Sequence, residues 1–318
     1  MSSSPKFLRA NYGDLYGSSM LPVLEEIFRS NLELHPSRRE ALFQIKRTDR
    51  DIYQSTELHD MPQFNQMSEG EDYSFNSPKQ GSSKTIVPVK YGLGFSISEE
   101  AVEDGKMDFI ADAVRKLAES ARESQEVSAM NILNNGFSSE TTADGVAVFS
   151  TVHTLPSGST FRNRLSTDAD LSVTSLETML LDFETQFIGD TGIIKRMVPK
   201  MLVVHPSNKR LAKELIGSDL KVNSVVSGAD NGPTNAMNSY KEEGLSVISS
   251  PHLTDADAWF MICEPEKNGL RIISRKPIET KAGGMDSGYI NDSILYKSRY
   301  REKIAAIHPY GVFGTSGA

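Results

Sequence analysis

The chain has 318 residues, of which 38% are hydrophobic and 24% charged, a composition typical of a soluble globular protein with a substantial core. Its net charge of −8 argues against broad electrostatic capture of nucleic acid, which needs clustered Lys and Arg facing the phosphates. No stretch approaches the roughly 18 apolar residues of a membrane span, and the N-terminus does not lead into the apolar core of a signal peptide. The single cysteine, Cys263, lies in an apolar run and is expected to be a buried, inert thiol.

The first 40 residues are predicted to form an N-terminal arm. Residues 1 to about 20 are polar and lack periodicity, which indicates an extended segment. Leu24, Ile27 and Phe28 then recur at helical spacing. This short helix packs either on its own domain or on a neighbouring subunit, and the sequence leaves both readings open.

Residues 41–97 are predicted to form a long two-stranded finger. Apolar residues alternate from Phe43 into a charged stretch that ends at Asp51, and the clearest alternation in the chain covers residues 87–97. Between these strands lie some three dozen polar residues, too many for a compact connection, with a tip expected at Met67 to Gly81. Because an isolated two-stranded ribbon is only marginally stable, the finger needs another surface to lie on.

The longest helical pattern runs from Met107 to Asn134 and predicts an amphipathic spine helix of roughly 40 Å. One apolar-to-small stripe is drawn by Ile110, Val114, Leu117, Ala121, Ser128 and Ile132. Small residues near its middle should allow a sheet or another backbone to approach closely. The sequence Asn134-Asn135-Gly136 predicts the end of the helix, because these residues tolerate the left-handed conformation.

A mixture of helices and strands follows and predicts an α/β domain over residues 165–270. It should contain a helix that begins at Thr167 or Asp168, a buried strand at Met201–Val204 and a helix that opens at Pro206. Further strands are expected at residues 245–248, 258–263 and 270–274.

The C-terminal segment returns to a period of two, with Tyr296 and Tyr300 on one side. Four basic residues lie on the other side: Lys297, Arg299, Arg301 and Lys303. A strand of this length is the natural sheet partner of residues 87–97. Residues 98–164 and 271–318 would then form one discontinuous domain around the spine helix, with the 165–270 domain inserted between its two parts.

A search for catalytic or metal-binding motifs is negative. The chain has no nucleophile elbow, phosphate-binding loop, zinc-protease motif or Cys pair. Its six histidines show no ligand spacing, and Asp255 with Asp257 is better explained by turn chemistry before an apolar strand. We therefore predict no catalytic residue, cofactor or metal.

Several motifs, which occur together and in the same order along the chain, resemble those of the major head subunits of Mu-like tailed phages and prophages. They comprise the run from Thr85 to Phe95, the end of the spine at residues 134–137, the stretches 200–206 and 253–260, and the closing residues 301–314. The similarity covers nearly the whole chain from about Ala41 and implies an α+β fold, the tailed-phage capsid fold. That fold comprises an N-terminal arm, an extended loop, a peripheral domain with the spine helix and an axial domain.

The resemblance implies a structural protein that assembles with itself, through pentamers and hexamers, into an icosahedral head around double-stranded DNA. The implied partners are a portal protein, scaffolding proteins and decoration proteins, with no membrane, and the implied location is the virion, assembled in the host bacterial cytoplasm. Two alternatives remain: an encapsulin-like compartment holding enzyme cargo, and a hydrolase whose catalytic groups lie outside recognisable motifs.

Contacts between subunits are expected to use complementary charge. The finger tip carries Glu69, Glu71 and Asp72, and a neighbouring subunit could present to it the basic row of Lys297, Arg299, Arg301 and Lys303. Alternatively, the basic row meets Glu119, Glu123 and Glu126 of its own spine.

Overall fold

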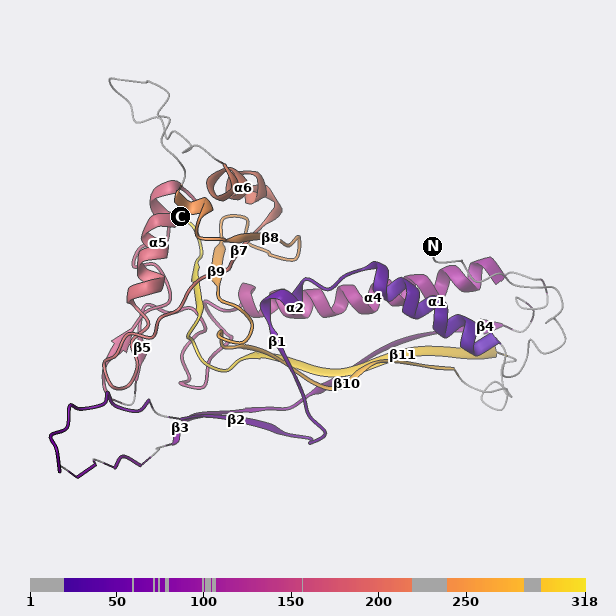
Figure 1. Cartoon of the computed structure of the whole chain (residues 1–318). Helices are drawn as coiled ribbons and strands as arrows, with labels where there is room; N and C mark the ends of the chain where they lie inside the picture. Colours follow the sequence, from indigo (N-terminus) through magenta and orange to yellow (C-terminus); the bar gives the residue numbers. More distant parts are fainter. Residues whose placement is uncertain are drawn as a thin grey trace, which may run out of the picture.

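The protein is elongated in the computed structural model, with a long helix-on-sheet layer at one end and a compact α/β unit at the other (Figure 1). The structure describes residues 20–58, 60–70, 72–73, 75–77, 80–98, 100, 104, 107–155, 157–218, 239–282 and 293–318. The expected extended arm before residue 20, Glu71 of the tip and most of the loop between residues 217 and 244 lie outside these residues.

The spine helix α4 spans Met107–Asn134, as its periodicity predicts. Ile110, Val114 and Leu117 are buried, which confirms the first half of the expected stripe. Gly136 follows the helix for a different reason from the predicted one, since it is not among the glycines with positive φ. A Cβ there would lie 2.7 Å from the ring of Phe149, so glycine is required by packing.

Beneath the spine lies a four-stranded sheet in the order β1-β10-β11-β4. Its strands are β1 (Gln44–Arg47), β10 (Leu270–Ala282), β11 (Ser293–Ala306) and β4 (Val89–Ser98). β11 pairs antiparallel with β4, which confirms the pairing expected between the C-terminal segment and residues 87–97. β10 continues well past the predicted end at residue 274, with register shifts after Ser274 and Lys276.

Two further helices lie with α4 on the same side of this sheet: α1 (Met20–Leu34) and α2 (Arg39–Leu42). Leu24, Ile27 and Phe28 of α1 are buried in one cluster with Ile110 and Val114 of α4. Of the two readings left open, the described part of the arm therefore takes the first, and α1 packs on its own subunit.

The predicted finger was wrong in its choice of strands. The two-stranded hairpin consists of β2 (Tyr53–Leu58) and β3 (Gln80–Ile86), whereas the outer strands belong to the main sheet. β1 pairs in parallel with β10, because burial of Leu42 and Phe43 just before it anchors the chain in the central core. The hairpin root is held on the sheet by Ile86, which packs with buried residues of β10 and β11.

The second unit is built on a four-stranded sheet in the order β12-β9-β7-β8. Its strands are β7 (Met201–Val204), β8 (Ser246–Ser249), β9 (Trp259–Ile262) and β12 (Val312–Thr315), and its helical segments are α5 (Val173–Thr185), η2 (Pro206–Asn208), α6 (Lys209–Gly217) and η3 (Ser239–Lys241). A small ribbon of β5 (His153–Thr154) and β6 (Thr160–Phe161) lies beside it.

Two local differences from prediction concern this unit. α5 begins at Val173 rather than at Thr167 or Asp168, because Ser172 and Ser175 form a reciprocal capping box there. The final strand β12 returns to pair with β9, so the last residues of the chain belong to the second sheet. The two units share a core, in which Met130 and Leu133 of α4 pack with Phe260 of β9.

Candidate assembly surfaces

The basic row on β11 faces away from the spine helix. Tyr296 and Tyr300 are buried on the helix side of the strand, so the alternating basic residues lie on the opposite face. Lys297 and Lys303 are exposed. Arg299 is half-buried and lies 3.4 Å from Glu279, and Arg301, also half-buried, donates to the carbonyl of Pro88 over 3.4 Å.

The spine glutamates have other neighbours. Glu119 lies 3.5 Å from His35, and Glu126 accepts hydrogen bonds of 2.9 Å from Ser37 Oγ and Arg38 N. Glu126 therefore holds the start of α2 rather than the basic row. Pairing of the row with its own spine, the second alternative, is not what the structure shows.

A groove runs along the exposed face of β4 and β11. It has a volume of about 700 Å³ and is lined on one side by Lys90, Gly92 and Gly94 of β4. The strand lies so close to β11 that a Cβ on Gly94 would come within 2.8 Å of the Tyr296 carbonyl. The glycines leave backbone uncovered, with Lys297 and Arg299 along the other wall. The basic row therefore borders a shallow groove beside the edge strand β4.

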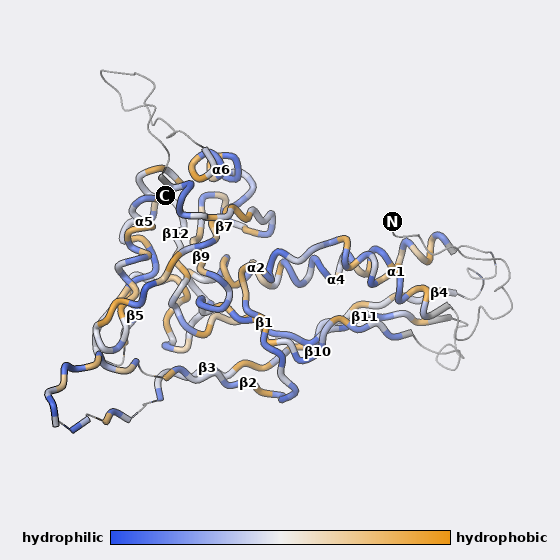
Figure 2. Tube along the Cα trace, viewed as in Figure 1, coloured by the Kyte–Doolittle hydropathy of each residue, from blue (hydrophilic) through white to orange (hydrophobic). Residues whose placement is uncertain are grey.

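The connection between β2 and β3 carries the predicted acidic tip, and Glu69 and Asp72 are exposed. It also exposes large aromatic side chains, which the sequence analysis missed: Phe64 at 104%, Tyr73 at 75% and Phe75 at 97%. Figure 2 shows hydrophobic and hydrophilic residues interleaved along this loop. Among the described residues, no ion pair joins the tip to the basic row of the same subunit.

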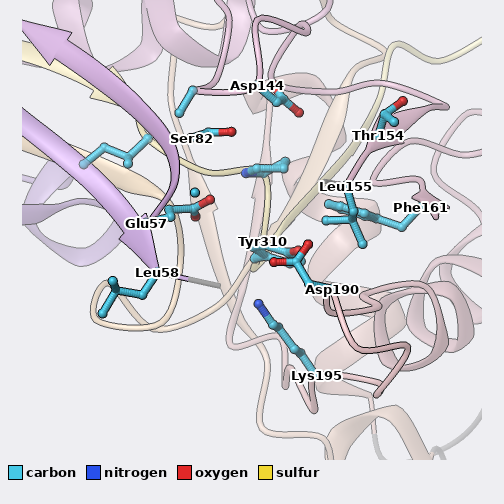
Figure 3. Close-up of a pocket in the computed structure, with 14 residues that line it drawn as sticks. Glu57, Leu58, Ser82, Asp144, Thr154, Leu155, Phe161, Asp190, Lys195 and Tyr310 are labelled. Atoms are coloured by element: carbon cyan, nitrogen blue, oxygen red, sulfur yellow. The ribbon is translucent and has the colours of Figure 1, made fainter. Parts of the chain in front are cut away.

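The loop end of the hairpin, where β2 ends and β3 begins, meets the second unit around a pocket of about 140 Å³ (Figure 3). Asp60, just after β2, lies 3.0 Å from Lys195 Nζ, and its carboxylate accepts a 3.1 Å hydrogen bond from Asp190 N. The Lys195 ammonium lies 4.0 Å from the centre of the Tyr310 ring. The contacts of Asp60 with Lys195 and Asp190 join the hairpin to a loop about 130 residues away in sequence. No local sequence pattern indicates such a contact.

Two ionisable side chains of the hairpin are half-buried, and one of them, Glu57, lines this pocket. Burial raises the pKa of Glu57 above its usual value, an effect opposed by nearby Lys195. Burial lowers the pKa of Lys84, whose ammonium donates to the backbone carbonyls of Thr141 and Ala306. The partners of Lys84 are fixed groups within its own subunit, so its role here is to attach the hairpin.

The buried His153 has hydrogen-bond partners on both ring nitrogens, which tests the hydrolase alternative. Its Nδ1 lies 2.7 Å from Asp144 and its Nε2 lies 3.1 Å from Asn163 Oδ1. Asn163 donates through its amide nitrogen to Val148 O, so its oxygen is the acceptor for His153. The second nitrogen is thus occupied by an amide instead of a nucleophile, and the pair is structural.

The remaining candidates also show structural environments. Cys263 is buried, donates to Val198 O over 3.1 Å, and has its pKa raised to about 12 by burial, which suits an inert thiol. Within the described residues, no group of three His, Cys, Asp or Glu side chains could hold a metal ion. No helix in this part of the chain is long and apolar enough to cross a membrane.

Comparison with known proteins places these features in a family. The model of a phage capsid protein family matches residues 81–314, more than half of the chain. No curated protein sequence matches significantly.

Solved structures with the same fold include viral and virus-like shells. The virus-like particle from Pyrococcus furiosus aligns with a TM-score of 0.56 and 11% identity, over 94% of this chain and 100% of that one. The capsid of Cyanophage P-SCSP1u has a TM-score of 0.56 and 11% identity, over 89% and 88% of the two chains. A structure from Mycobacterium phage Adephagia has a TM-score of 0.52 and 10% identity, over 99% of both.

Proposed function

Because this chain belongs to the phage capsid protein family, we propose that it assembles through pentamers and hexamers into an icosahedral head that encloses double-stranded DNA. The family makes it a structural component of the virion and not an enzyme. Its α+β fold is that of phage capsid subunits, as the resemblance implied. The Mu-like subgroup, the portal, scaffolding and decoration partners, and assembly in the host cytoplasm form part of the proposal.

The observation that carries the assembly proposal is the tip between β2 and β3. It extends beyond the core and exposes three aromatic side chains that have no core of their own to enter. Large exposed apolar groups on one segment are typical of interaction sites. The tip is therefore proposed to lie on a neighbouring subunit.

The receiving surface is proposed to be the groove beside the basic row on β11. The tip is acidic and the row is basic, so the charges of the two surfaces are complementary. Complementary charge chiefly fixes the register and speeds the encounter of two surfaces. Lys297 and Lys303, the exposed members of the row, are best placed to attract Glu69 and Asp72 of a neighbour.

Changing Glu69, Glu71 and Asp72 together to lysine tests this contact. Shell yield should fall, while the circular dichroism and melting of the unassembled subunit stay near wild type, because the described tip residues are exposed. Added salt should reproduce part of the loss in wild type, since exposed charges are screened. The combined reversal, with Lys297 and Lys303 changed to glutamate, should restore yield. Wild-type yield from the acidic-to-basic variant would show that the tip is only a solvated loop.

Electron microscopy of the purified protein tests the function itself. Closed shells of uniform size are expected, and a compact monomer at every concentration would contradict the proposal. The fold alone does not separate a phage head from another closed shell, because the virus-like particle from Pyrococcus furiosus aligns over its full length. The contents of particles purified from infected or induced cells separate the two: DNA supports a phage head, and protein cargo supports a compartment.

The domain boundaries are also a proposal, because membership of the family does not determine them. The predicted boundaries are residues 1–40 for the arm, 41–97 for the loop, 98–164 with 271–318 for the peripheral domain, and 165–270 for the axial domain. Because β1 and β4 belong to the main sheet, the part of 41–97 that projects as a loop is confined to the segment between them. The return of β12 to the second sheet favours a shorter peripheral segment at the C-terminus.

A further inference from the structure

The strand β4 leaves one long edge of the main sheet open. It has ten residues, and in the described structure no further strand pairs with its outer side. Every second residue of such an edge strand directs its backbone N–H and C=O groups away from the sheet, where they can pair with another extended chain. Prolines and charged side chains usually protect an edge, but β4 contains no proline and only one charged residue, Lys90.

The opposite edge of the same sheet is protected. β1 has only four residues and ends with Lys46 and Arg47. Beyond its last pair with β1, at Ser274, β10 carries Pro277 next to Lys276. Short edge strands, lysine and proline all hinder the addition of another strand. β4 is therefore the edge of the main sheet at which a strand from another chain is best accommodated.

The two faces of β4 differ in chemistry. The face on the side of the spine helix carries three apolar residues that are between 37% and 59% exposed, here called the β4 stripe: Val89, Tyr91 and Leu93. Tyr91 stacks on the buried Tyr300 with ring centroids 5.1 Å apart, which fixes the side on which the stripe lies. The opposite face carries Lys90 and borders the groove beside the basic row. A matching strand would alternate aromatic with polar or acidic side chains.

The tip between β2 and β3 contains a segment with this alternation. Residues 72–76 read Asp-Tyr-Ser-Phe-Asn, so the aromatic residues Tyr73 and Phe75 share one side of an extended chain. Asp72, Tyr73 and Phe75 are exposed, and the described residues of this segment form neither helix nor strand within their own subunit. The tip lies far from β4 in the elongated molecule (Figure 1), so the segment would have to pair with β4 of another subunit.

On the basis of the proposed function, we propose that residues 72–76 of one subunit add as a strand to the open edge of β4 in a neighbouring subunit. Tyr73 and Phe75 then cover the β4 stripe, and Asp72 lies toward the basic face. Backbone hydrogen bonds supply affinity in this mode of binding, and the alternating side chains supply specificity. A slip by one residue would turn the aromatic side chains onto the basic face, so the alternation selects the register.

Disulfide formation in assembled shells tests the pairing. Since Tyr73 and Phe75 occupy two neighbouring positions of a three-residue stripe, one of them must face its middle residue, Tyr91. Cysteine at residue 91 is therefore combined with a single cysteine at each of residues 72–76, and a second series uses cysteine at residue 90. Residues that face each other on paired strands lie close enough for a disulfide, whereas side chains on opposite faces do not. The native Cys263 is buried and should stay unreacted.

The yield of cross-linked chains under oxidising conditions should alternate along the segment. With Tyr91→Cys, it should be several-fold higher for residue 73 or 75 than for residues 72, 74 and 76. With Lys90→Cys, the preference should reverse to the even-numbered residues. A flat profile in shells, or the same preference in both series, would overturn the strand pairing and leave the proposed function intact. If the wild type formed no shells, the proposed function itself would fail, and this inference with it.

Two lysine substitutions on β4 provide a matched pair. Leu93 and Ser96 are both exposed, but they lie on opposite faces of the strand, and Ser96 lines the groove. Both variants should therefore keep the wild-type circular dichroism. Leu93→Lys places a charge on the β4 stripe, so shell yield should fall tenfold or more, whereas Ser96→Lys should retain it. Equal shell yields from the two variants would overturn the proposal.

Discussion

A buried ion pair joins three parts of the fold, and its removal should destabilise the subunit severely. Arg39 of α2 lies 2.6 Å from Glu302 of β11, with side chains only 6% and 4% exposed. The second oxygen of Glu302 accepts from Gln125 of α4 over 3.3 Å. Glu302→Ala would leave the guanidinium buried without its partner. Breaking a buried pair from one side typically costs about 3–5 kcal/mol, a large share of the stability of an ordinary domain.

Urea unfolding of the unassembled subunit measures this loss. Trp259 is the only tryptophan and is completely buried, so its fluorescence reports on the core. The matched control is Glu25→Ala, which removes the exposed pair with Arg29, whose side chain is 73% exposed. Exposed pairs contribute about 0–1 kcal/mol, so the control should stay close to wild type.

The paired substitution Arg39→Met with Glu302→Leu separates the loss of attraction from the stranded charge. Replacing both partners by apolar side chains of similar volume is often neutral or stabilising. The double variant should therefore recover most of the stability lost in Glu302→Ala. If Glu302→Ala cost less than about 1 kcal/mol, or if the double variant were the less stable of the two, the electrostatic reasoning would be refuted.

Three further predictions follow from burial and exposure. Leu117→Asp should prevent soluble folding, because a carboxylate on this buried helix face has no partner to offset its desolvation; soluble, assembling protein would mean that the helix faces are misassigned. Glu57 has a folded pKa above its usual 4.5, so its contribution to stability is fully present below the unfolded pKa and is lost as the pH rises through the folded value. Urea midpoints across that window should therefore fall with rising pH more steeply in wild type than in Glu57→Gln, and parallel curves would contradict this. Phe64→Ser with Phe75→Ser should abolish shell formation in electron micrographs while leaving subunit melting unchanged, and normal shells would remove the aromatic tip from assembly.

Local patterns were sufficient where a segment forms most of its contacts through one regular face. The spine helix was predicted from Met107 to Asn134 because 28 residues of amphipathic periodicity end in a run of helix-terminating residues. The pairing of β11 with β4 followed from two long alternating segments. The division of β11 into a buried tyrosine face and a basic face was also visible in its sequence.

The hairpin could not be placed from the sequence because its position depends on distant contacts. β2 and β3 are polar and short, and their attachment relies on Ile86 in a small cluster and on Asp60, whose partner Lys195 belongs to another unit. Similarly, the capping box of Ser172 and Ser175 competes successfully with the earlier start signal at Thr167 or Asp168. Ser124 was expected to allow a strand to approach the spine helix closely, but it borders an open space between α4 and the strands β4 and β11. Small residues allow either a close contact or an open space, and the side chains on the opposing strands determine which of the two forms.

The tip can contribute to an interface through its acidic side chains and through burial of its aromatic side chains. The sequence analysis identified only the acidic side chains, which make the smaller contribution to the free energy of binding. An exposed ion pair contributes about 0–1 kcal/mol, so even several pairs between the tip and the basic row would supply a modest part of an interface. An aromatic side chain buries roughly 150–250 Å². Fully burying a phenylalanine side chain contributes roughly 1.5–3 kcal/mol before the cost of ordering it in the interface. Phe64 and Phe75, the most exposed of the aromatic residues that the structure describes, should therefore supply most of the attraction. The acidic residues then determine where on the neighbour the tip comes to lie, so reversing them should slow or misdirect assembly, whereas removing the rings should remove its driving force.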